Sequence, residues 1–242
     1  MSLPTFSIIT VCRNEEGAIR ETCESIVAQE HEDFEWIVID GGSTDGTLEI
    51  LNEYSGSIRH LVSEPDAGIY NAMNKGAAMA TGEYLIFMNG GDRFADSDSL
   101  LFAGQSPRAQ MLYGDVYLGD QSGDVEAYPD VVESGYMLRK MIPHQATFYQ
   151  RATFEAAGGY DESFKIAADY DLYVRLFERE RISHHHIPHP IAIFDLEGIS
   201  NSKDFRQLRK RENHRIRKQY FKKYRFSMKC LRQEIRNFIG RK

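Results

Sequence analysis

Acidic side chains follow apolar, strand-like segments at several points in the first hundred residues. Asp40 and Asp45 lie in the segment DGGSTDGT, residues 40–47, and Asp92 ends the segment NGGD, residues 89–92. A carboxylate can accept hydrogen bonds from a ribose or a pyrimidine nitrogen, and it can help to hold Mg²⁺ or Mn²⁺, which prefer oxygen ligands. The pattern therefore indicates a nucleotide diphosphate bound together with a divalent metal.

Local structure offers a second explanation of the same residues. Asp-Gly-Gly-Ser and Asn-Gly-Gly-Asp are ordinary turn sequences, and Asp45 could cap a helix that begins at Thr47. Each loop taken alone fits a turn or a cap. Their joint placement after successive strands favours a shared site.

These loops need a scaffold that brings the ends of several strands to one crevice. Apolar and β-branched runs predict strands at 6–12, 34–39, 59–62 and 84–88, and amphipathic spacing predicts helices at 17–29, 44–54 and 69–80, the first with Asn14 as its cap. This alternation is typical of a doubly wound α/β fold, with a mostly parallel sheet and helices on both faces. Ligands bind such sheets beyond the carboxyl ends of the strands.

Beyond Asp92 the pattern is less regular. We expect strands at 111–117, 127–129, 146–149 and 191–194 and helices at 151–157 and 169–180. The composition changes near Ser200. The sequence therefore predicts a catalytic domain at 1–202, with a nucleotide-binding half at about 1–92 and an acceptor half at about 93–202, followed by a basic helical tail at 203–242.

Four blocks in a fixed order resemble the family 2 glycosyltransferases. They are SIITV before Arg13 and Asn14, VIDGGSTDGT at 38–47, SEPDAGIYNAMNKG at 63–76 and ATGE at 80–83. The resemblance covers roughly residues 5–200 and is nearest to bacterial exopolysaccharide and O-antigen enzymes, including those of colanic acid assembly. It implies a GT-A fold, a nucleotide-sugar donor, with a UDP-sugar favoured, and inversion at the anomeric carbon.

The resemblance also assigns roles by position. Asp40 would contact the base and Asp45 would shape the same pocket, while Asp92 matches the last residue of the family's Asp-x-Asp metal motif. Asp169, in the segment IAADYDL, matches the catalytic base. The other candidate donor-binding residues are Thr10, Arg13, Asn14, Glu15, Gly42, Ser43, Asp66, Tyr70, Asn74, Lys75, Asn89, Gly90, Gly91, His144 and Gln145.

The sequence departs from the family pattern in three places. Asn89 replaces the first carboxylate of the metal motif, so that a Mn²⁺ or Mg²⁺ ion would depend more on Asp92, phosphates and water. Ala168 precedes the base where many relatives carry Glu. The Gln-x-x-Arg-Trp motif of the processive synthases is absent, since the single tryptophan, Trp36, lies in a predicted strand. The resemblance therefore implies the addition of one sugar at a time.

Several other polar residues have both a structural and a functional interpretation. His144 resembles a His-Gln segment near the donor or acceptor in the same subgroup, although a histidine beside a strand is as often structural. Asp171 could support the site or stabilise a helix start. Histidines 184–186 would point to alternate faces of a strand and lack zinc spacing, so we expect no metal there.

Charge is distributed unevenly along the chain. Residues 203–242 carry 16 Lys and Arg against 3 Asp and Glu, a net of +13, whereas the rest carries 13 against 33, a net of −20. Apolar residues Leu231, Ile235, Phe238 and Ile239 share one helical face with basic residues Lys229, Arg232, Arg236, Arg241 and Lys242. Such a helix favours an anionic membrane surface, or packing on the acidic body or a partner subunit. A homodimer is left open.

Composition also limits the cellular setting. Cys12, Cys23 and Cys230 form no Cys-x-x-Cys pair and indicate reduced thiols in a cytosol. Neither a signal peptide nor a run of about 18 apolar residues is present. We therefore expect a cytoplasmic protein attached peripherally to the inner face of the membrane, close to a saccharide or lipid-linked saccharide acceptor.

Two other functions compete with sugar transfer. A nucleotidyltransferase would need a Gly-rich, basic loop after the first strand, and the segment RNEE at 13–16 is a poor candidate. A nucleic-acid-binding module could use the basic tail, but the acidic body argues against an extended nucleic-acid surface, so we expect no nucleic-acid partner. The favoured function is an inverting glycosyltransferase with Asp169 as its base.

Overall fold

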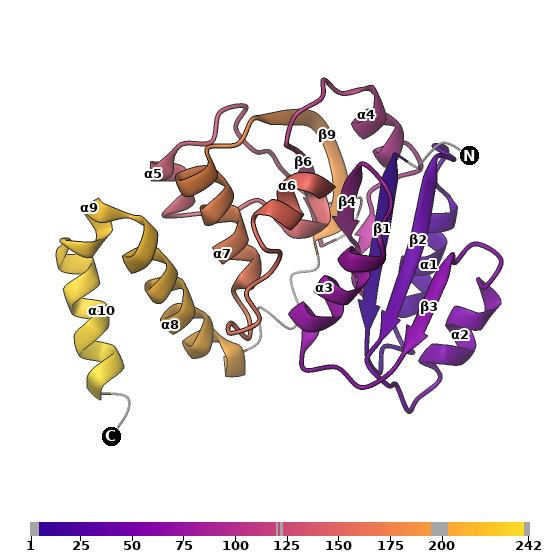
Figure 1. The fold of residues 1–242 in the computed structure, drawn as a ribbon, viewed down its shortest axis with the longest axis horizontal. Helices are drawn as coiled ribbons and strands as arrows, with labels where there is room; N and C mark the ends of the chain where they lie inside the picture. The colour runs from indigo at the N-terminus through magenta and orange to yellow at the C-terminus, as the bar shows by residue number, and fades with distance from the viewer. Residues whose placement is uncertain (1–4, 120, 122, 195–202, 240–242) are drawn as a thin grey trace.

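The structure, a computed structural model, describes residues 5–119, 121, 123–194 and 203–239. Its described strands form one sheet in the order β3-β2-β1-β4-β8-β6-β9-β5, with β7 paired to β6 (Figure 1). The strands are β1 (Phe6–Cys12), β2 (Phe34–Asp40), β3 (His60–Ser63), β4 (Tyr84–Phe87), β5 (Arg93–Phe94), β6 (Met111–Leu118), β7 (Val125–Glu126), β8 (Thr147–Gln150) and β9 (His184–Phe194).

The first four strands are parallel, because helices connect them across the sheet. β1 pairs with β2 and β4, and β2 pairs with β3, with Cys12 opposite Asp40 at the carboxyl ends. The connecting helices are α1 (Ile19–Val27), α2 (Thr47–Glu53) and α3 (Ile69–Met79). A Cβ on Gly76 of α3 would lie 2.5 Å from Ile9 Cγ2, so this glycine allows α3 to lie directly on β1. The predicted doubly wound α/β class is confirmed.

A buried carboxylate ties the amino-terminal ends of these strands together. Glu35 Oε1 accepts hydrogen bonds from Ser7 Oγ at 2.6 Å and from the N–H of Thr81 at 2.5 Å, while Arg59 Nη1 lies 3.0 Å from Oε2. Glu35 is only 4% exposed. Its negative charge is therefore stabilised by donors from β1 and from the segments before β3 and β4.

The second half of the sheet is mixed. β8 is antiparallel to both β4 and β6, whereas β9 runs parallel to β6 along its whole length. The remaining elements here are α4 (Ser99–Gln105), α5 (Ser134–Met137), the short 3₁₀-helix η1 (His144–Ala146), α6 (Arg151–Ala156), α7 (Ala168–Val174) and the π-helical turn η2 (Arg175–Glu180). The sheet thereby places η1 and the start of α7 near the end of β4.

Some sequence predictions need correction. The strand expected at 127–129 lies at 125–126, because the N–H of Tyr128 donates to the Asp115 side chain instead of to a strand. The last strand begins at His184, seven residues before the expected start at 191, because pairing with β6 extends it. Asn14 does not cap α1, which begins at Ile19 after Ala18. The short elements β5, α4, α5 and η1 were not predicted.

The C-terminal region is helical and packs on the body. It consists of α8 (Lys203–Tyr220), α9 (Lys222–Arg225) and α10 (Met228–Ile239), and α8 lies beside α7 (Figure 1). Ile216 of α8 is fully buried. Arg217 Nε donates to the Tyr170 hydroxyl at 3.1 Å, and the Arg215 guanidinium lies 4.4 Å from the centre of the Phe164 ring. No described helix is both long and apolar enough to span a bilayer.

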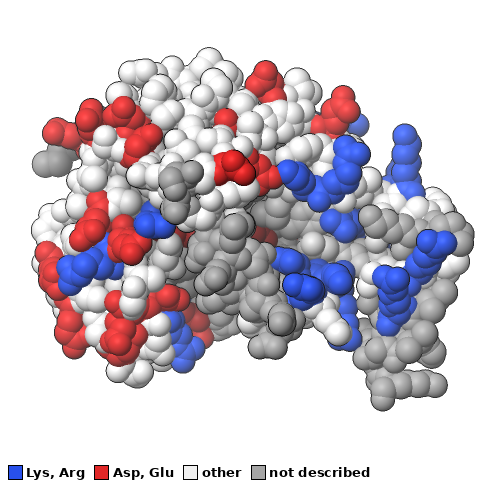
Figure 2. Space-filling model, turned by 180° about the vertical axis from the view of Figure 1, so that it is seen from behind, with Lys and Arg blue, Asp and Glu red and all other residues white. Residues whose placement is uncertain are grey.

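The uneven charge of the sequence is visible on the surface. Figure 2 shows Lys and Arg gathered over the C-terminal helices and Asp and Glu over the rest of the same face. The exposed basic residues of the described helices include Arg206, Lys210, Lys222, Lys223, Arg225, Arg232 and Arg236. Residues 241 and 242 and the side chains at 229, 235, 238 and 239, which belong to the predicted amphipathic face, lie outside the described ones.

Candidate active site

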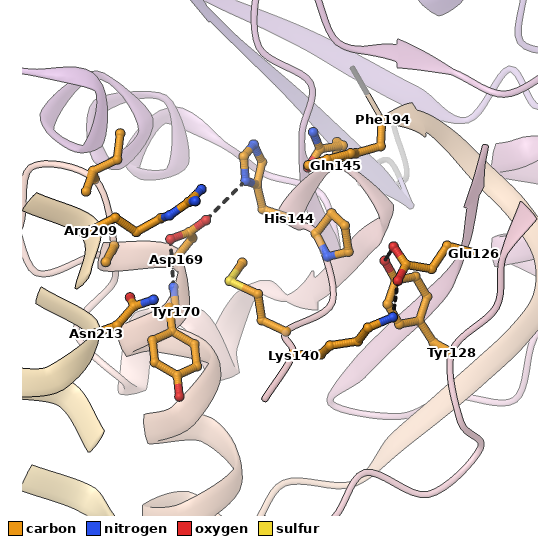
Figure 3. Close-up of a pocket in the computed structure, with 14 residues that line it drawn as sticks. Glu126, Tyr128, Lys140, His144, Gln145, Asp169, Tyr170, Phe194, Arg209 and Asn213 are labelled. Atoms are coloured by element: carbon orange, nitrogen blue, oxygen red, sulfur yellow. Dashed lines mark hydrogen bonds and ion pairs between the residues drawn. The ribbon is translucent and has the colours of Figure 1, made fainter. Parts of the chain in front are cut away.

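A cavity of about 390 Å³ opens between η1, the start of α7 and α8 (Figure 3). Asp169 and His144 line it, and Arg209 extends from α8 toward the Asp169 carboxylate. The lining residues are Glu126, Tyr128, Lys140, Met141, Pro143, His144, Gln145, Ile166, Ala167, Asp169, Tyr170, Phe194, Arg209 and Asn213. The wall therefore combines apolar surface with charged groups, as expected of a site for a polar substrate.

Asp169 occupies the first turn of α7, where the helix dipole favours a negative charge. Its Oδ1 accepts hydrogen bonds from the N–H of Tyr170 at 2.7 Å and from the Tyr70 hydroxyl at 3.3 Å. Burial and then the charge of Asp169 raise the pKa of Tyr70 well above its ordinary value, so Tyr70 remains a donor. The carboxylate is thus oriented while about a fifth of its side chain, 19%, stays accessible.

His144 lies between two carboxylates. Its Nδ1 is 3.7 Å from Asp169 Oδ2, and its Nε2 is 3.7 Å from Asp92 Oδ2. Burial lowers the pKa of His144, but the contacts with Asp169 and Asp92 outweigh burial and raise the pKa to about 9. The two carboxylates therefore favour the protonated form of the imidazole.

Asp92 is held by the loop that follows β4. Its Oδ2 accepts from the N–H of Asn89 at 3.1 Å, and its Oδ1 accepts from Gln145 Nε2 at 3.0 Å. Gly91 adopts a φ of +91°, which glycine allows and which closes this tight turn. Asn89 Nδ2 also lies 3.1 Å from His144 Nε2. The predicted residues Asn89, Asp92, His144 and Gln145 thus form one cluster.

The loop after β2 is held by its own hydrogen bonds. The buried Asp40 carboxylate accepts from the N–H of Ser43 at 3.0 Å and from Ser63 Oγ at 2.6 Å. Asp45 Oδ1 accepts from the N–H and the hydroxyl of Thr47, and these bonds lower the pKa of Asp45. Asp45 therefore stabilises the start of α2 through Thr47, although the N-cap residue is Gly46 and not Asp45.

The loop after β1 packs against the loop after β2. Asn14, with a φ of +55°, accepts from the N–H of Thr44 at 2.9 Å through its side chain and donates its own N–H to Ser43 Oγ at 2.8 Å. These bonds replace the predicted capping of α1. Burial, followed by the charges of Asp45 and Asp92, raises the pKa of the neighbouring Glu15. Acidic groups from three strand ends therefore converge.

The other predicted donor-binding residues lie in β1, in α3 and in the strand-end loops. Thr10 is buried and accepts from Trp36 Nε1 at 2.9 Å, and Lys75 forms an ion pair with Glu64 at 2.7 Å. The Asn74 side chain donates to the Tyr160 carbonyl at 2.9 Å and so holds the segment after α6. Arg13, Gly42, Asp66 and Gly90 belong to the loops at the carboxyl ends of β1 to β4.

Structural roles account for the remaining polar residues that the sequence singled out. Asp171 is buried and forms an ion pair with Arg175 at 2.7 Å. Each histidine of the 184–186 segment lies in β9, and His186 bonds to Asp115 at 2.8 Å and Asp130 at 2.7 Å. The cysteines are free and buried, as predicted for reduced thiols.

Sequence reasoning missed the contribution of α8. Arg209 and Asn213 line the cavity, and Glu212 accepts hydrogen bonds from the N–H groups of Lys165 and Ile166, just before α7. The signal was available, because Arg209, Glu212 and Asn213 recur at helical spacing with the buried Ile216. The basic residues of this region surround a packing face that contacts the body.

The cluster around Asp92 fits a divalent cation. Like charges at Asp45 and Asp92 help to raise the pKa of Glu15, and a cation would relieve that repulsion. Asn89, whose N–H donates to Asp92, also carries a buried side-chain oxygen, Oδ1, that has no hydrogen-bond partner. The Asp92 carboxylate and this amide oxygen are both oxygen donors of the kind that Mg²⁺ and Mn²⁺ prefer.

The sequence is similar to those of known glycosyltransferases. The sequence model of glycosyl transferase family 2 matches residues 7–152. A PGL/p-HBAD biosynthesis glycosyltransferase of Mycobacterium bovis is 30% identical over 210 residues, which cover 84% of this chain and 81% of that protein.

Solved structures share the fold. TarS 1-349 of S. aureus in complex with UDP-GlcNAc aligns with a TM-score of 0.68 and 18% identity, covering 92% of this chain and 73% of that one. The mannosyltransferase PcManGT of Pyrobaculum calidifontis, in complex with GDP-Man and Mn²⁺, aligns with a TM-score of 0.66 and 18% identity, covering 89% of this chain and 64% of that one. The fold is therefore GT-A, and the chain belongs to glycosyl transferase family 2.

Proposed function

We propose that this glycosyltransferase moves a single sugar from a nucleotide-sugar donor, with a UDP-sugar favoured, to an acceptor hydroxyl with inversion. The proposal rests on the contacts of His144 with Asp92 on one side and Asp169 on the other. These contacts join the strand-end loops to the cavity. The donor nucleotide would lie on the loops after β1, β2 and β4, and the acceptor would enter the cavity beside Asp169.

Asp169 is the base in this proposal. Its carboxylate takes the proton of the acceptor hydroxyl while that oxygen forms a bond to the anomeric carbon, and the bond from this carbon to the diphosphate breaks. Tyr70 holds Oδ1 of the base, and His144 faces Oδ2. Direct displacement in one step inverts the anomeric configuration.

Asp92, with Asn89 beside it, would hold a Mn²⁺ or Mg²⁺ ion. A bound cation supplies charge stabilisation to the departing diphosphate. The Mn²⁺ named with GDP-Man in the PcManGT structure supports this proposal. Gln145 and the N–H of Asn89 fix the orientation of the Asp92 carboxylate.

The acceptor is a saccharide, most simply a lipid-linked one, and the basic C-terminal helices attach the protein to the cytoplasmic face of an anionic membrane. The exposed basic side chains of Figure 2 support this part, together with Phe226, which is 86% exposed, and Leu231, which is 49% exposed. Each basic residue near an anionic surface contributes about 1 kcal/mol, so a few contacts would suffice for peripheral binding.

A panel of UDP-, GDP- and dTDP-sugars, with and without Mn²⁺, tests the function. A ligand that binds only the folded state stabilises it by about 2.7 kcal/mol at a concentration of one hundred times its Kd. We expect one nucleotide class to raise the melting temperature more with Mn²⁺, and its sugar to appear on an acceptor by mass spectrometry. If no nucleotide sugar stabilised the protein, the donor assignment would be wrong.

A further inference from the structure

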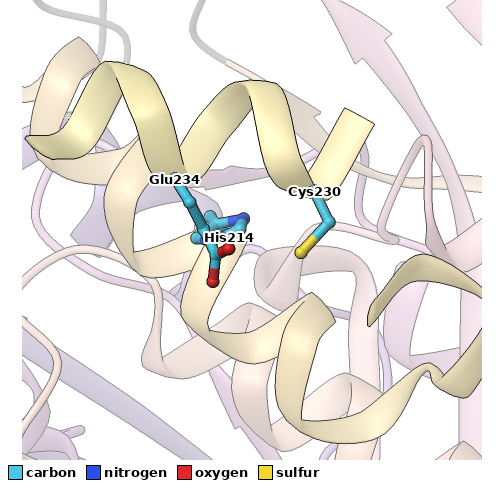
Figure 4. A group of neighbouring side chains, drawn as sticks. All are labelled: His214, Cys230 and Glu234. Atoms are coloured by element: carbon cyan, nitrogen blue, oxygen red, sulfur yellow. The ribbon is translucent and has the colours of Figure 1, made fainter. Parts of the chain in front are cut away.

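Three side chains that commonly bind zinc meet between α8 and α10, away from the cavity (Figure 4). His214 comes from α8, and Cys230 and Glu234 come from α10. One ligand atom from each lies within 4.8 Å of the others. Because Cys230 and Glu234 are four residues apart in a helix, they share one face, which is turned toward His214.

The surroundings give this cluster the features of a built site. His214 is 7% exposed and Cys230 is 2% exposed, so both are removed from bulk solvent. The Tyr224 hydroxyl lies 3.0 Å from His214 Nδ1 and fixes the orientation of the ring, as second-shell groups do for metal-binding histidines. Glu234 is only partly buried, which leaves a path for an ion from solvent.

Close packing of two helices would require neither a thiol, nor an imidazole, nor a carboxylate at one point. Lys218 forms an ion pair with Glu234 Oε1, and a carboxylate has a second oxygen that can bind a cation. Among the described residues, this is the one group of three His, Cys, Asp or Glu side chains placed closely enough to share an ion. The three side chains therefore form a candidate cation site.

We propose that His214, Cys230 and Glu234 bind a zinc ion that joins α8 to α10. Zinc bonds of about 2.0–2.3 Å in a tetrahedral site place ligand atoms roughly 3.3–3.8 Å apart, so the observed spacing needs only a small side-chain movement. Binding forms a Zn–S bond and releases the thiol proton of Cys230 to solvent. A fourth position is left to water.

Ligand chemistry separates this site from the one at Asp92. A thiolate and an imidazole favour Zn²⁺, whereas an oxygen-only site shared with phosphates suits Mn²⁺ or Mg²⁺. The zinc site would stabilise the C-terminal helices whether or not a donor is bound. The proposal therefore does not depend on the proposed transfer reaction.

Cobalt substitution in the full-length chain tests the site. The probe is Co²⁺ added to the metal-free Asp92→Ala variant, in which the candidate catalytic metal site is removed. We expect a thiolate-to-cobalt charge-transfer band in the near ultraviolet at one equivalent, displaced by Zn²⁺ but not by Mn²⁺. Adding Cys230→Ser or His214→Gln should weaken binding at least tenfold, whereas the matched control Cys23→Ser, which alters another buried thiol, should leave the titration unchanged.

A second measurement keeps the proposal testable if a variant fails to fold. X-ray absorption of the zinc-loaded Asp92→Ala protein should show one sulfur at about 2.3 Å together with nitrogen or oxygen ligands. An absorption spectrum without a sulfur ligand would overturn the proposal, as would a cobalt band that survives Cys230→Ser. Absence of any band at stoichiometric Co²⁺ would assign the cluster to helix packing alone.

Discussion

Replacing Glu212 by Ala should reduce sugar transfer much more than donor binding. Glu212 is 9% exposed, and its two oxygens accept the N–H groups of Lys165 at 2.9 Å and Ile166 at 3.0 Å. These residues directly precede α7, whose first turn carries Asp169. Glu212, which belongs to α8, therefore fixes the segment that positions the base Asp169.

The size of the effect follows from these two bonds. A hydrogen bond to a charged group contributes about 1.5–3 kcal/mol, so losing both would cost roughly 3 kcal/mol at the lower end. A loop released in this way can move the base by about 1 Å, which typically costs about 10²-fold in rate. The hydrogen bonds of Glu212 go to the segment before α7 rather than to the donor loops after β1, β2 and β4, so donor affinity should stay within a few-fold.

Single-turnover assays measure sugar transfer, calorimetry measures donor affinity, and urea unfolding measures stability. Glu212→Gln, which keeps one acceptor oxygen, should fall between Glu212→Ala and the wild type, and Lys210→Ala, on the exposed face of the same helix, should match the wild type. A folded Glu212→Ala protein with normal turnover would refute the positioning role, and a parallel loss of donor affinity would show that the damage is not local.

Three further predictions concern the metal, the sheet and the tail. Asp92→Ala should weaken donor binding only when Mn²⁺ is present, and equal calorimetric affinity of mutant and wild type would contradict the metal assignment. Burial raises the pKa of Glu35, but the surrounding hydroxyl, amide and guanidinium donors outweigh it and lower the pKa. The stabilisation from the ionised Glu35 is therefore complete above its unfolded-state pKa near 4.5 and is lost as the pH falls through its folded-state pKa. The loss of unfolding free energy caused by Glu35→Gln, measured with urea, should therefore become smaller in acid. A loss that does not change with pH would refute this. Changing Lys222 and Lys223 to Glu should abolish sedimentation with anionic liposomes at low salt and leave donor binding intact, whereas unchanged sedimentation would exclude this surface.

The nucleotide-binding half of the fold was predictable because its signals are local. Continuous apolar runs marked β1, β2 and β4, and each predicted loop lies at the carboxyl end of its strand. The roles of individual carboxylates were harder to foresee. Asp45 stabilises the start of α2 through Thr47, and this depends on a turn geometry that also fits ligand binding.

The centre of the site could not be derived from spacing. Asp92, His144 and Asp169 come from distant segments, and only the antiparallel placement of β8 beside β4 brings η1 to the end of β4. Tyr70 was assigned to the donor, but its hydroxyl donates to Asp169. The contribution of α8 to the site was not predicted, because its many basic residues indicated a membrane anchor. Its residue Glu212 in fact contacts the body.

Transfer by the Asp169→Asn variant tests most directly whether Asp169 accepts the proton of the acceptor hydroxyl. Asn keeps the shape of the side chain and its contact with the Tyr70 hydroxyl but cannot take the proton. We expect single-turnover transfer to fall by ~10² or more while donor affinity, measured in parallel, stays within a few-fold. Near-normal transfer by a folded Asp169→Asn protein would contradict it.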